Sequence, residues 1–142
     1  MTSISECLNY LFESTRKANG LARLFERVYN SLAPGGLFIF DIAEPGQVTE
    51  GRVIRGFSEG EDWTVLVEKM EQQGRLTRRI ITFRKVGNNY RRDDETHVQR
   101  LYKAEDVAKE LRRAGFRVRT TRRYGRYDLP KAHAAFIARK PS

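Results

Sequence analysis

The apolar run at residues 37–42 constrains the fold most, and it directly follows a Pro-Gly-Gly turn at residues 34–36. Its apolar side chains do not alternate with polar ones, which predicts a strand buried on both faces. Such strands are typical of parallel sheets that are covered by helices. Ligands bind beyond the carboxyl ends of these strands, so Asp41 is a candidate functional carboxylate. The open alternative is an acid that caps the following turn.

The composition fits one folded domain of 142 residues with a heavily charged surface. The formal net charge of +9 favours anionic partners, namely nucleic acid, phosphorylated substrates or an acidic membrane surface. No nucleic-acid recognition motif accompanies the arginine-rich segments, so a solvated basic face is the preferred interpretation. No segment is long and apolar enough to span a membrane, and the amino terminus does not resemble a secretory signal. We therefore expect a cytoplasmic protein without a membrane partner.

The potential metal ligands and thiols are few. Cys7 is the single cysteine, so an internal disulfide is impossible, and we expect its side chain in a core. The two histidines, His97 and His133, lie far apart in the sequence. We therefore expect no metal site.

Two amphipathic helices flank the middle of the chain. The first carries apolar residues at helical spacing over residues 21–32, with Asn19 placed to cap its start. The second covers residues 107–114, with acidic residues in its first turn and Gly115 at its carboxyl end. Strands are predicted after it at residues 116–121 and 133–139.

The middle of the chain has the pattern of an antiparallel meander. Three predicted strands at residues 63–72, 75–86 and 90–102 are separated by turn signals at residues 73–74 and 87–89. Residues 47–60 form either a loop or a short edge strand. We therefore expect a three-stranded antiparallel insertion at about residues 52–102 within a single α/β domain, residues 1–142.

The order of these motifs resembles the carboxyl-terminal half of class I S-adenosylmethionine-dependent methyltransferases. The Leu-x-Pro-Gly-Gly turn before the fifth strand of that family matches residues 32–36, and Ala-Gly-Phe before the sixth strand matches residues 114–116. The family orders its strands 3-2-1-4-5-7-6. The resemblance implies a partial Rossmann-like sheet with strands equivalent to 4-5-7-6, formed by residues 1–4, 37–42, 133–139 and 116–121.

The resemblance also implies a small-molecule methyltransferase with S-adenosylmethionine as cofactor, although it identifies no catalytic residue. It places Ser5 and Glu6 at the cofactor. It places the following residues beside the methyl acceptor: Asn9, Tyr10, Asp41, Trp63, His97, Arg100 and Tyr102. Tyr10 could equally pack on the sheet, and His97 in a polar strand could simply be solvated.

The resemblance further implies that the first three strands of the family, with their glycine-rich turn and ribose-binding acid, are missing. We therefore expect a truncated protein that binds the cofactor weakly. An uncovered sheet edge favours a homo-oligomer or a partner chain that completes the sheet. Two alternative functions stay open, a non-catalytic self-associating module and a basic nucleic-acid-binding module.

Overall fold

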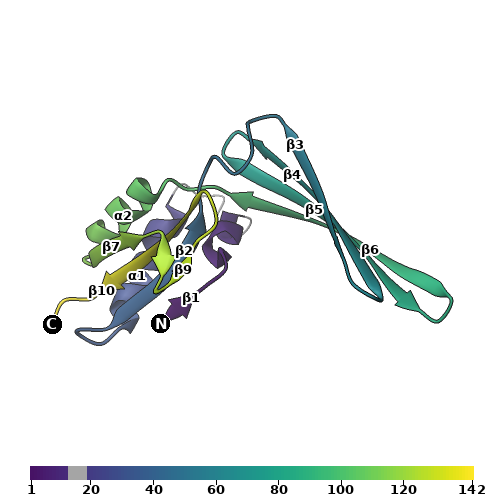
Figure 1. The fold of residues 1–142 in the computed structure, drawn as a ribbon. Helices are drawn as coiled ribbons and strands as arrows, with labels where there is room; N and C mark the ends of the chain where they lie inside the picture. Colours follow the sequence, from purple (N-terminus) through teal and green to yellow (C-terminus); the bar gives the residue numbers. More distant parts are fainter. Residues whose placement is uncertain (13–18) are drawn as a thin grey trace. The chain divides into compact units, whose positions relative to one another are not determined.

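The computed structural model describes residues 1–12 and 19–142 (Figure 1). The chain divides into two compact units. Unit 1 comprises residues 1–45 and 100–142, and unit 2 comprises residues 46–99. No helix in the described part of the chain is both long enough and apolar enough to cross a membrane.

Unit 1 contains a four-stranded sheet in the order β1-β2-β10-β7. These strands are β1 (Thr2–Ser3), β2 (Leu37–Ala43), β10 (His133–Arg139) and β7 (Arg117–Thr121). β1 runs parallel to β2, whereas β10 runs antiparallel to both β2 and β7. This arrangement confirms the expected 4-5-7-6 order.

The described residues of unit 1 form three helical segments, namely the short 3₁₀ helix η1 (Cys7–Phe12), α1 (Gly20–Ser31) and α2 (Ala104–Arg113). Asn19 occupies the cap position of α1, but its side chain makes no capping hydrogen bond. At the other end of α1, Lys140 Nζ donates to the carbonyl oxygens of Tyr29 and Leu32 at 2.9 and 2.8 Å. A cation at this position favours the helix because the last carbonyls carry partial negative charge. Gly115 follows α2 with a φ of +102°, as expected of a carboxyl-terminal cap.

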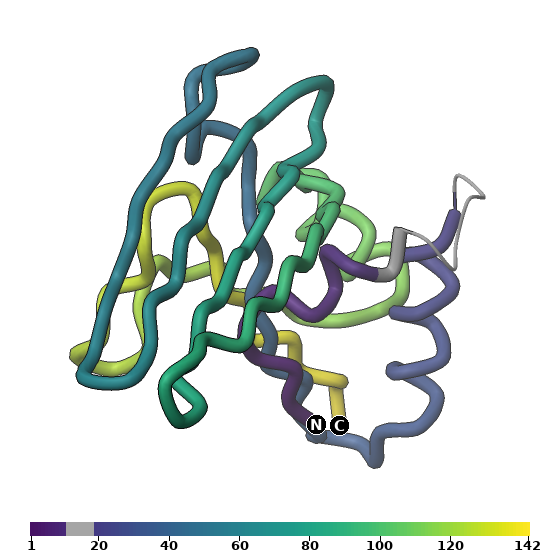
Figure 2. The backbone as a smooth tube through the Cα atoms, turned by 90° about the vertical axis from the view of Figure 1, so that its right-hand side faces the viewer, coloured from purple at the N-terminus to yellow at the C-terminus, as the bar shows by residue number. Residues whose placement is uncertain are grey.

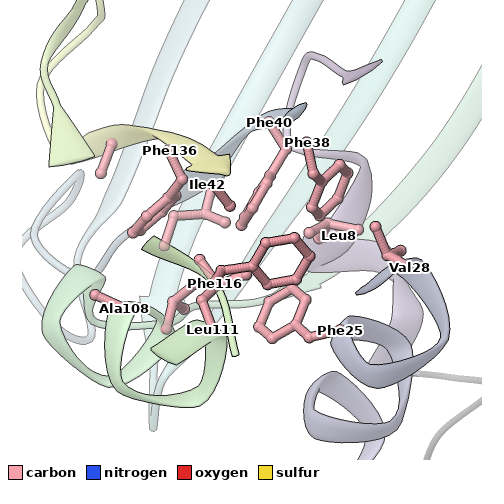
Figure 3. Close-up of a cluster of buried hydrophobic side chains, with 13 residues drawn as sticks. Leu8, Phe25, Val28, Phe38, Phe40, Ile42, Ala108, Leu111, Phe116 and Phe136 are labelled. Carbon is pink, nitrogen blue, oxygen red and sulfur yellow. The ribbon is translucent and has the colours of Figure 1, made fainter. Parts of the chain in front are cut away.

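Aromatic side chains between the sheet and its helices form the core of unit 1 (Figure 3). Phe40 is fully buried, and its ring stacks on Phe38 and Phe136 at centroid distances of 4.6 and 4.9 Å. Phe25 of α1 packs on Phe40 at 5.7 Å. β2 is buried on both faces only over its second half, because Leu37 at its start is 42% exposed. Cys7 is exposed, contrary to our expectation of a core thiol, because it lies at the start of η1.

Unit 2 is an antiparallel sheet of four strands, one more than expected. In order these are β3 (Val53–Glu59), β4 (Trp63–Gln72), β5 (Arg75–Val86) and β6 (Asn89–Arg100), and they form a continuous meander (Figure 2). β3 pairs with β4 along its whole length. It is an edge strand with every residue exposed, which explains why its sequence gave a weak strand signal.

Carboxylates balance the arginines of unit 2. Arg79 and Arg92 both bind Asp94, with N–O distances of 2.7 Å. The hydrogen bond from Arg79 is the main cause that lowers the pKa of Asp94 to about 2. Arg55 on the edge strand pairs with Glu68 of β4 at 3.2 Å. The basic face expected here is therefore largely neutralised.

Removal of the Phe40 ring tests the importance of the aromatic core. We expect Phe40→Ala to lower the free energy of unfolding of unit 1 by about 3–5 kcal/mol, since the ring leaves a cavity. Leu37→Ala, at the exposed start of the same strand, should cost well under about 1.5 kcal/mol and is the control. Hydrogen exchange of the amides of β10 and β5 would report the stability of unit 1 and of unit 2 separately. Equal destabilisation of unit 1 by the two variants would contradict this account.

Candidate functional site at the carboxyl ends of β1 and β2

The parallel strands β1 and β2 bring their carboxyl ends to the same edge of the sheet. The loop that leaves β1 has an unusual backbone, since Ser5 and Glu6 have φ values of 70° and 60°. Residues other than glycine rarely adopt this left-handed conformation, and they keep it only where the surroundings enforce it. We therefore identify the side chains that hold this loop in its left-handed conformation.

Asp41 provides these contacts. Its side chain is buried, and its carboxylate accepts hydrogen bonds from the main-chain N–H groups of Ser5 at 3.2 Å and Glu6 at 2.6 Å. A third bond comes from the Tyr124 hydroxyl at 3.0 Å. Hydrogen bonds to an ionised carboxylate are the stronger kind, so they can hold the loop in its strained conformation.

This arrangement corrects the expected position of Asp41. β2 continues to Ala43, so Asp41 lies within the strand, opposite Ala135 of β10. It caps the loop after β1 and not the turn that follows β2. Because alternate residues of a strand point to opposite faces, Asp41 lies on the face opposite Phe40.

Tyr124 closes the cluster from β8 (Arg123–Tyr124), which forms a small hairpin with β9 (Tyr127–Asp128). Burial is the main cause that raises the pKa of Tyr124 well above its usual range, and the adjacent Asp41 carboxylate raises it further. Tyr124 therefore remains a hydrogen-bond donor throughout the physiological pH range. Sequence reasoning missed this residue because the hairpin is short and lies in a predicted connection.

His133 was also missed as a site residue. It is buried at the start of β10, where its Nε2 contacts the Glu6 carboxylate. Its Nδ1 lies 2.8 Å from the carbonyl oxygen of Lys131, which can only accept, so Nδ1 carries a hydrogen. His133 thus orients the side chain of Glu6, while Asp41 orients its main chain. A histidine at the first residue of a small-residue strand was the available signal.

A second group of contacts surrounds Ala43 at the end of β2. Asn9 is fully buried, and its Nδ2 donates to the carbonyl oxygens of Ala43 at 2.9 Å and Arg100 at 2.6 Å. Its Oδ1 accepts the Ala43 N–H at 3.0 Å. The main-chain N–H of Tyr102 also donates to the Ala43 carbonyl, at 3.3 Å. Three predicted site residues therefore meet at one strand end.

Two side chains near this group, those of Tyr10 and Arg100, reach the surface. The Arg100 guanidinium lies 5.4 Å from the centroid of the Tyr102 ring, within the range of a cation–π contact. Burial raises the pKa of Tyr102, and the positive charge of Arg100 opposes this rise. Tyr10, next to Asn9 in η1, is 39% exposed. Tyr10 and Arg100 are accessible to a small molecule, whereas Asn9 acts through the main chain.

Trp63 and His97 lie in unit 2 and are not brought together. Trp63 begins β4 and pairs with Arg84, close to the β5–β6 turn, whereas His97 lies near the opposite end of β6. The Nε2 of His97 is 3.0 Å from a carboxylate oxygen of Glu95. The neighbouring acid Asp94 binds arginines instead. Among the described residues, no group of His, Cys, Asp and Glu side chains could hold a metal ion.

The sheet order β1-β2-β10-β7 agrees with the 4-5-7-6 order that the resemblance implied, and solved structures of S-adenosylmethionine-dependent methyltransferases share the fold. An S-adenosylmethionine-dependent methyltransferase from Clostridium acetobutylicum has a TM-score of 0.80 and 24% identity. The sugar N-methyltransferase KedS8 from Streptoalloteichus has a TM-score of 0.71 and 18% identity. CalS10, an amino pentose methyltransferase from Micromonospora echinaspora, has a TM-score of 0.75 and 15% identity.

The match covers nearly the whole chain but only part of each similar structure. It includes 99%, 99% and 98% of this chain, and 57%, 56% and 56% of the respective solved chains. No family model matches the sequence, and no curated protein matches it. This chain therefore has the fold of a little over half of such a methyltransferase, in agreement with the resemblance of its sequence motifs.

The hydrogen bond between Tyr124 and Asp41 predicts a change in tyrosine titration. In Asp41→Asn we expect the Tyr124 pKa to fall part of the way to the ordinary value of 10.0, because the negative charge is lost while burial remains. In the parent protein the folded state keeps the phenolic proton longer than the unfolded state does. The corresponding stabilisation is complete below about pH 10 and is lost as the pH rises further.

NMR titration of the tyrosine ring carbons would measure this effect. Tyr124→Phe identifies the resonance, because that variant lacks the titrating group. An unchanged Tyr124 titration in Asp41→Asn would contradict the assigned contact.

Proposed function

We propose that this chain is the acceptor-side part of an S-adenosylmethionine-dependent methyltransferase that acts on a small molecule. The observation that supports this proposal most is the strained loop after β1, which Asp41, Tyr124 and His133 hold at the carboxyl edge of a 4-5-7-6 sheet. Two of the similar structures are named for sugar substrates, an amino pentose among them, which favours a small acceptor.

The loop after β1 fits one part of the methyl donor, its positively charged sulfur. S-adenosylmethionine, when bound, supplies a methyl group on a positively charged sulfur. The Glu6 side chain, 18% exposed, provides a carboxylate on the loop after β1, and a carboxylate suits a neighbouring cation. Within the described residues, neither α1 nor α2 follows a strand through a glycine-rich turn, so these residues do not include the turn that usually holds the adenosine part of the cofactor.

The acceptor is proposed to lie near the end of β2, beside the exposed side chains of Tyr10 and Arg100 and the half-buried ring of Tyr102. Asn9 and Asp41 are positioning residues in this proposal, since both are buried and bind main-chain groups of the site. Placing the two reactants in line can supply much of the rate of a transfer reaction, so a catalytic triad is not required.

Titration with S-adenosylmethionine tests the proposal. We expect weak binding by these 142 residues, with a Kd above about 0.1 mM, because they supply only part of the donor contacts. NMR shift changes should centre on the amides of residues 5–7, and Glu6→Gln should reduce them. The matched control Glu26→Gln lies on the exposed face of α1. A submicromolar Kd, or shifts that avoid the loop after β1, would contradict the proposal.

A second proposal concerns self-association. β1 is the edge strand of the unit 1 sheet and is only two residues long, with Ile4 beyond it 45% exposed. Open edges pair readily with other strands unless charge or chain covers them. We propose that this edge pairs with a second copy or with a partner chain that extends the sheet.

Sedimentation at micromolar concentration checks the homo-oligomer. We expect dimers that Thr2→Lys weakens, since a charged side chain on the edge strand opposes pairing. The control is Thr49→Lys, an equal change at an exposed position of unit 2. A monomer at all concentrations would rule out pairing between copies.

A further inference from the structure

The positive charge of the protein is concentrated in one segment. Residues 100–142 contain thirteen Lys and Arg but only four Asp and Glu, whereas residues 46–99 contain ten and nine. The net charge of +9 therefore arises almost entirely from the segment that forms α2, β7, the β8–β9 hairpin and β10. The structure gathers part of this charge into a concave surface.

Two neighbouring cavities, of about 470 and 540 Å³, lie where the end of β2 meets the start of α2 and the loops that flank the β8–β9 hairpin. They share Glu44, Lys103 and Arg122, so they lie side by side, and together they are called the basic groove below. The charged residues of this basic groove are five cations and two carboxylates: Lys103, Lys109, Arg112, Arg122, Lys131, Glu44 and Glu105. All of them belong to unit 1.

Glu44 already places one anionic group at the centre of the basic groove. Its carboxylate accepts the Ala104 N–H at the start of α2 at 2.9 Å and pairs with Arg122. Arg122 also donates to the carbonyl oxygen of His133 at 2.5 Å, which fixes the guanidinium at the boundary of the two cavities. The Arg122 side chain is still 60% exposed, so part of the guanidinium faces solvent.

The remaining cations exceed the available carboxylates. Lys109 contacts Asp106 at 3.8 Å, but within the described residues Lys103, Arg112 and Lys131 have no carboxylate within ion-pair distance. These side chains come from both ends of α2 and from the loop before β10, and they converge on the same hollow. In unit 2, by contrast, the paired arginines lie on an open sheet.

We propose that the basic groove binds the phosphate end of a phosphorylated small molecule. Arginine and lysine are the usual partners of phosphate, and Arg122 is held in place before any ligand arrives. Cavities of this size accept a small molecule. An extended nucleic-acid backbone would bind on an open surface and would not need them. His133, which lines one cavity, also orients Glu6, so the groove adjoins the candidate site. Naming this molecule as the methyl acceptor rests on the proposed function.

Titration of the full chain with inorganic pyrophosphate tests the groove without any methyl donor. We expect saturable binding that weakens about tenfold in Lys131→Gln and in Lys103→Gln, since each variant loses one charge-assisted contact. These lysines are chosen because both are exposed, so their substitution should leave the fold intact. Arg84→Gln is the matched control, with the same loss of charge at an exposed position of unit 2.

Three results would overturn the proposal. The first is no saturable binding of pyrophosphate at millimolar concentration. The second is an equal loss of binding in Arg84→Gln, which would indicate nonspecific attraction to the net charge. The third is tight binding of a single-stranded RNA dodecamer that depends on Arg117 and Arg119 of β7 and not on Lys131. Because no donor is present, failure of the proposed methyltransferase function would leave pyrophosphate binding intact.

Discussion

The buried carboxylate of Asp41 joins three segments that lie far apart in the sequence. It binds the main chain after β1, stands within β2 and accepts the hydroxyl of Tyr124 from the hairpin near the end of the chain. A buried charge is costly unless hydrogen bonds satisfy it, and here the three donors do so. The left-handed conformation of Ser5 and Glu6, and with it the shape of the sheet edge, depends on this arrangement.

The candidate site consists of two groups of contacts, one at Asp41 and one at Ala43, and both of these residues belong to β2. Alternation along β2 places Phe40 in the aromatic core and Asp41 on the opposite face, so core packing and rim geometry are coupled through one strand. The second group gathers at Ala43, whose main chain binds both Asn9 and Tyr102. In both groups a side chain binds main-chain N–H or carbonyl groups. Substitution of other side chains does not remove these main-chain partners.

Charge has different consequences in the two units. In unit 2, Arg55 and Arg79 pair with carboxylates on neighbouring strands, and nine acidic residues nearly balance the ten basic ones. In unit 1 the cations around Arg122 outnumber the carboxylates and line a hollow. Runs of arginine that look alike in the sequence therefore have different roles, because only the fold decides which of them meet acids.

Local patterns in the sequence were sufficient for both main helices and for the buried strand, whereas the sheet order was expected from the family resemblance. The apolar run before Asp41, the Pro-Gly-Gly turn and the helical spacing of α1 and α2 all follow from hydrophobic periodicity and backbone preferences, which act between near neighbours. The fourth strand of unit 2 was uncertain because an exposed edge strand carries little such pattern.

Only the tertiary structure decided the composition of the site. The contacts of Asp41 with Tyr124 and of Glu6 with His133 join residues 83 and 127 positions apart, and no local pattern encodes such pairs. No local pattern encodes the contacts of Asn9 either, whose side-chain amide binds main-chain groups of Ala43 and Arg100. The basic groove also joins residues that are distant in the sequence. Hydrogen bonds and charge pairs depend on distance in space, which the sequence specifies only through the complete fold.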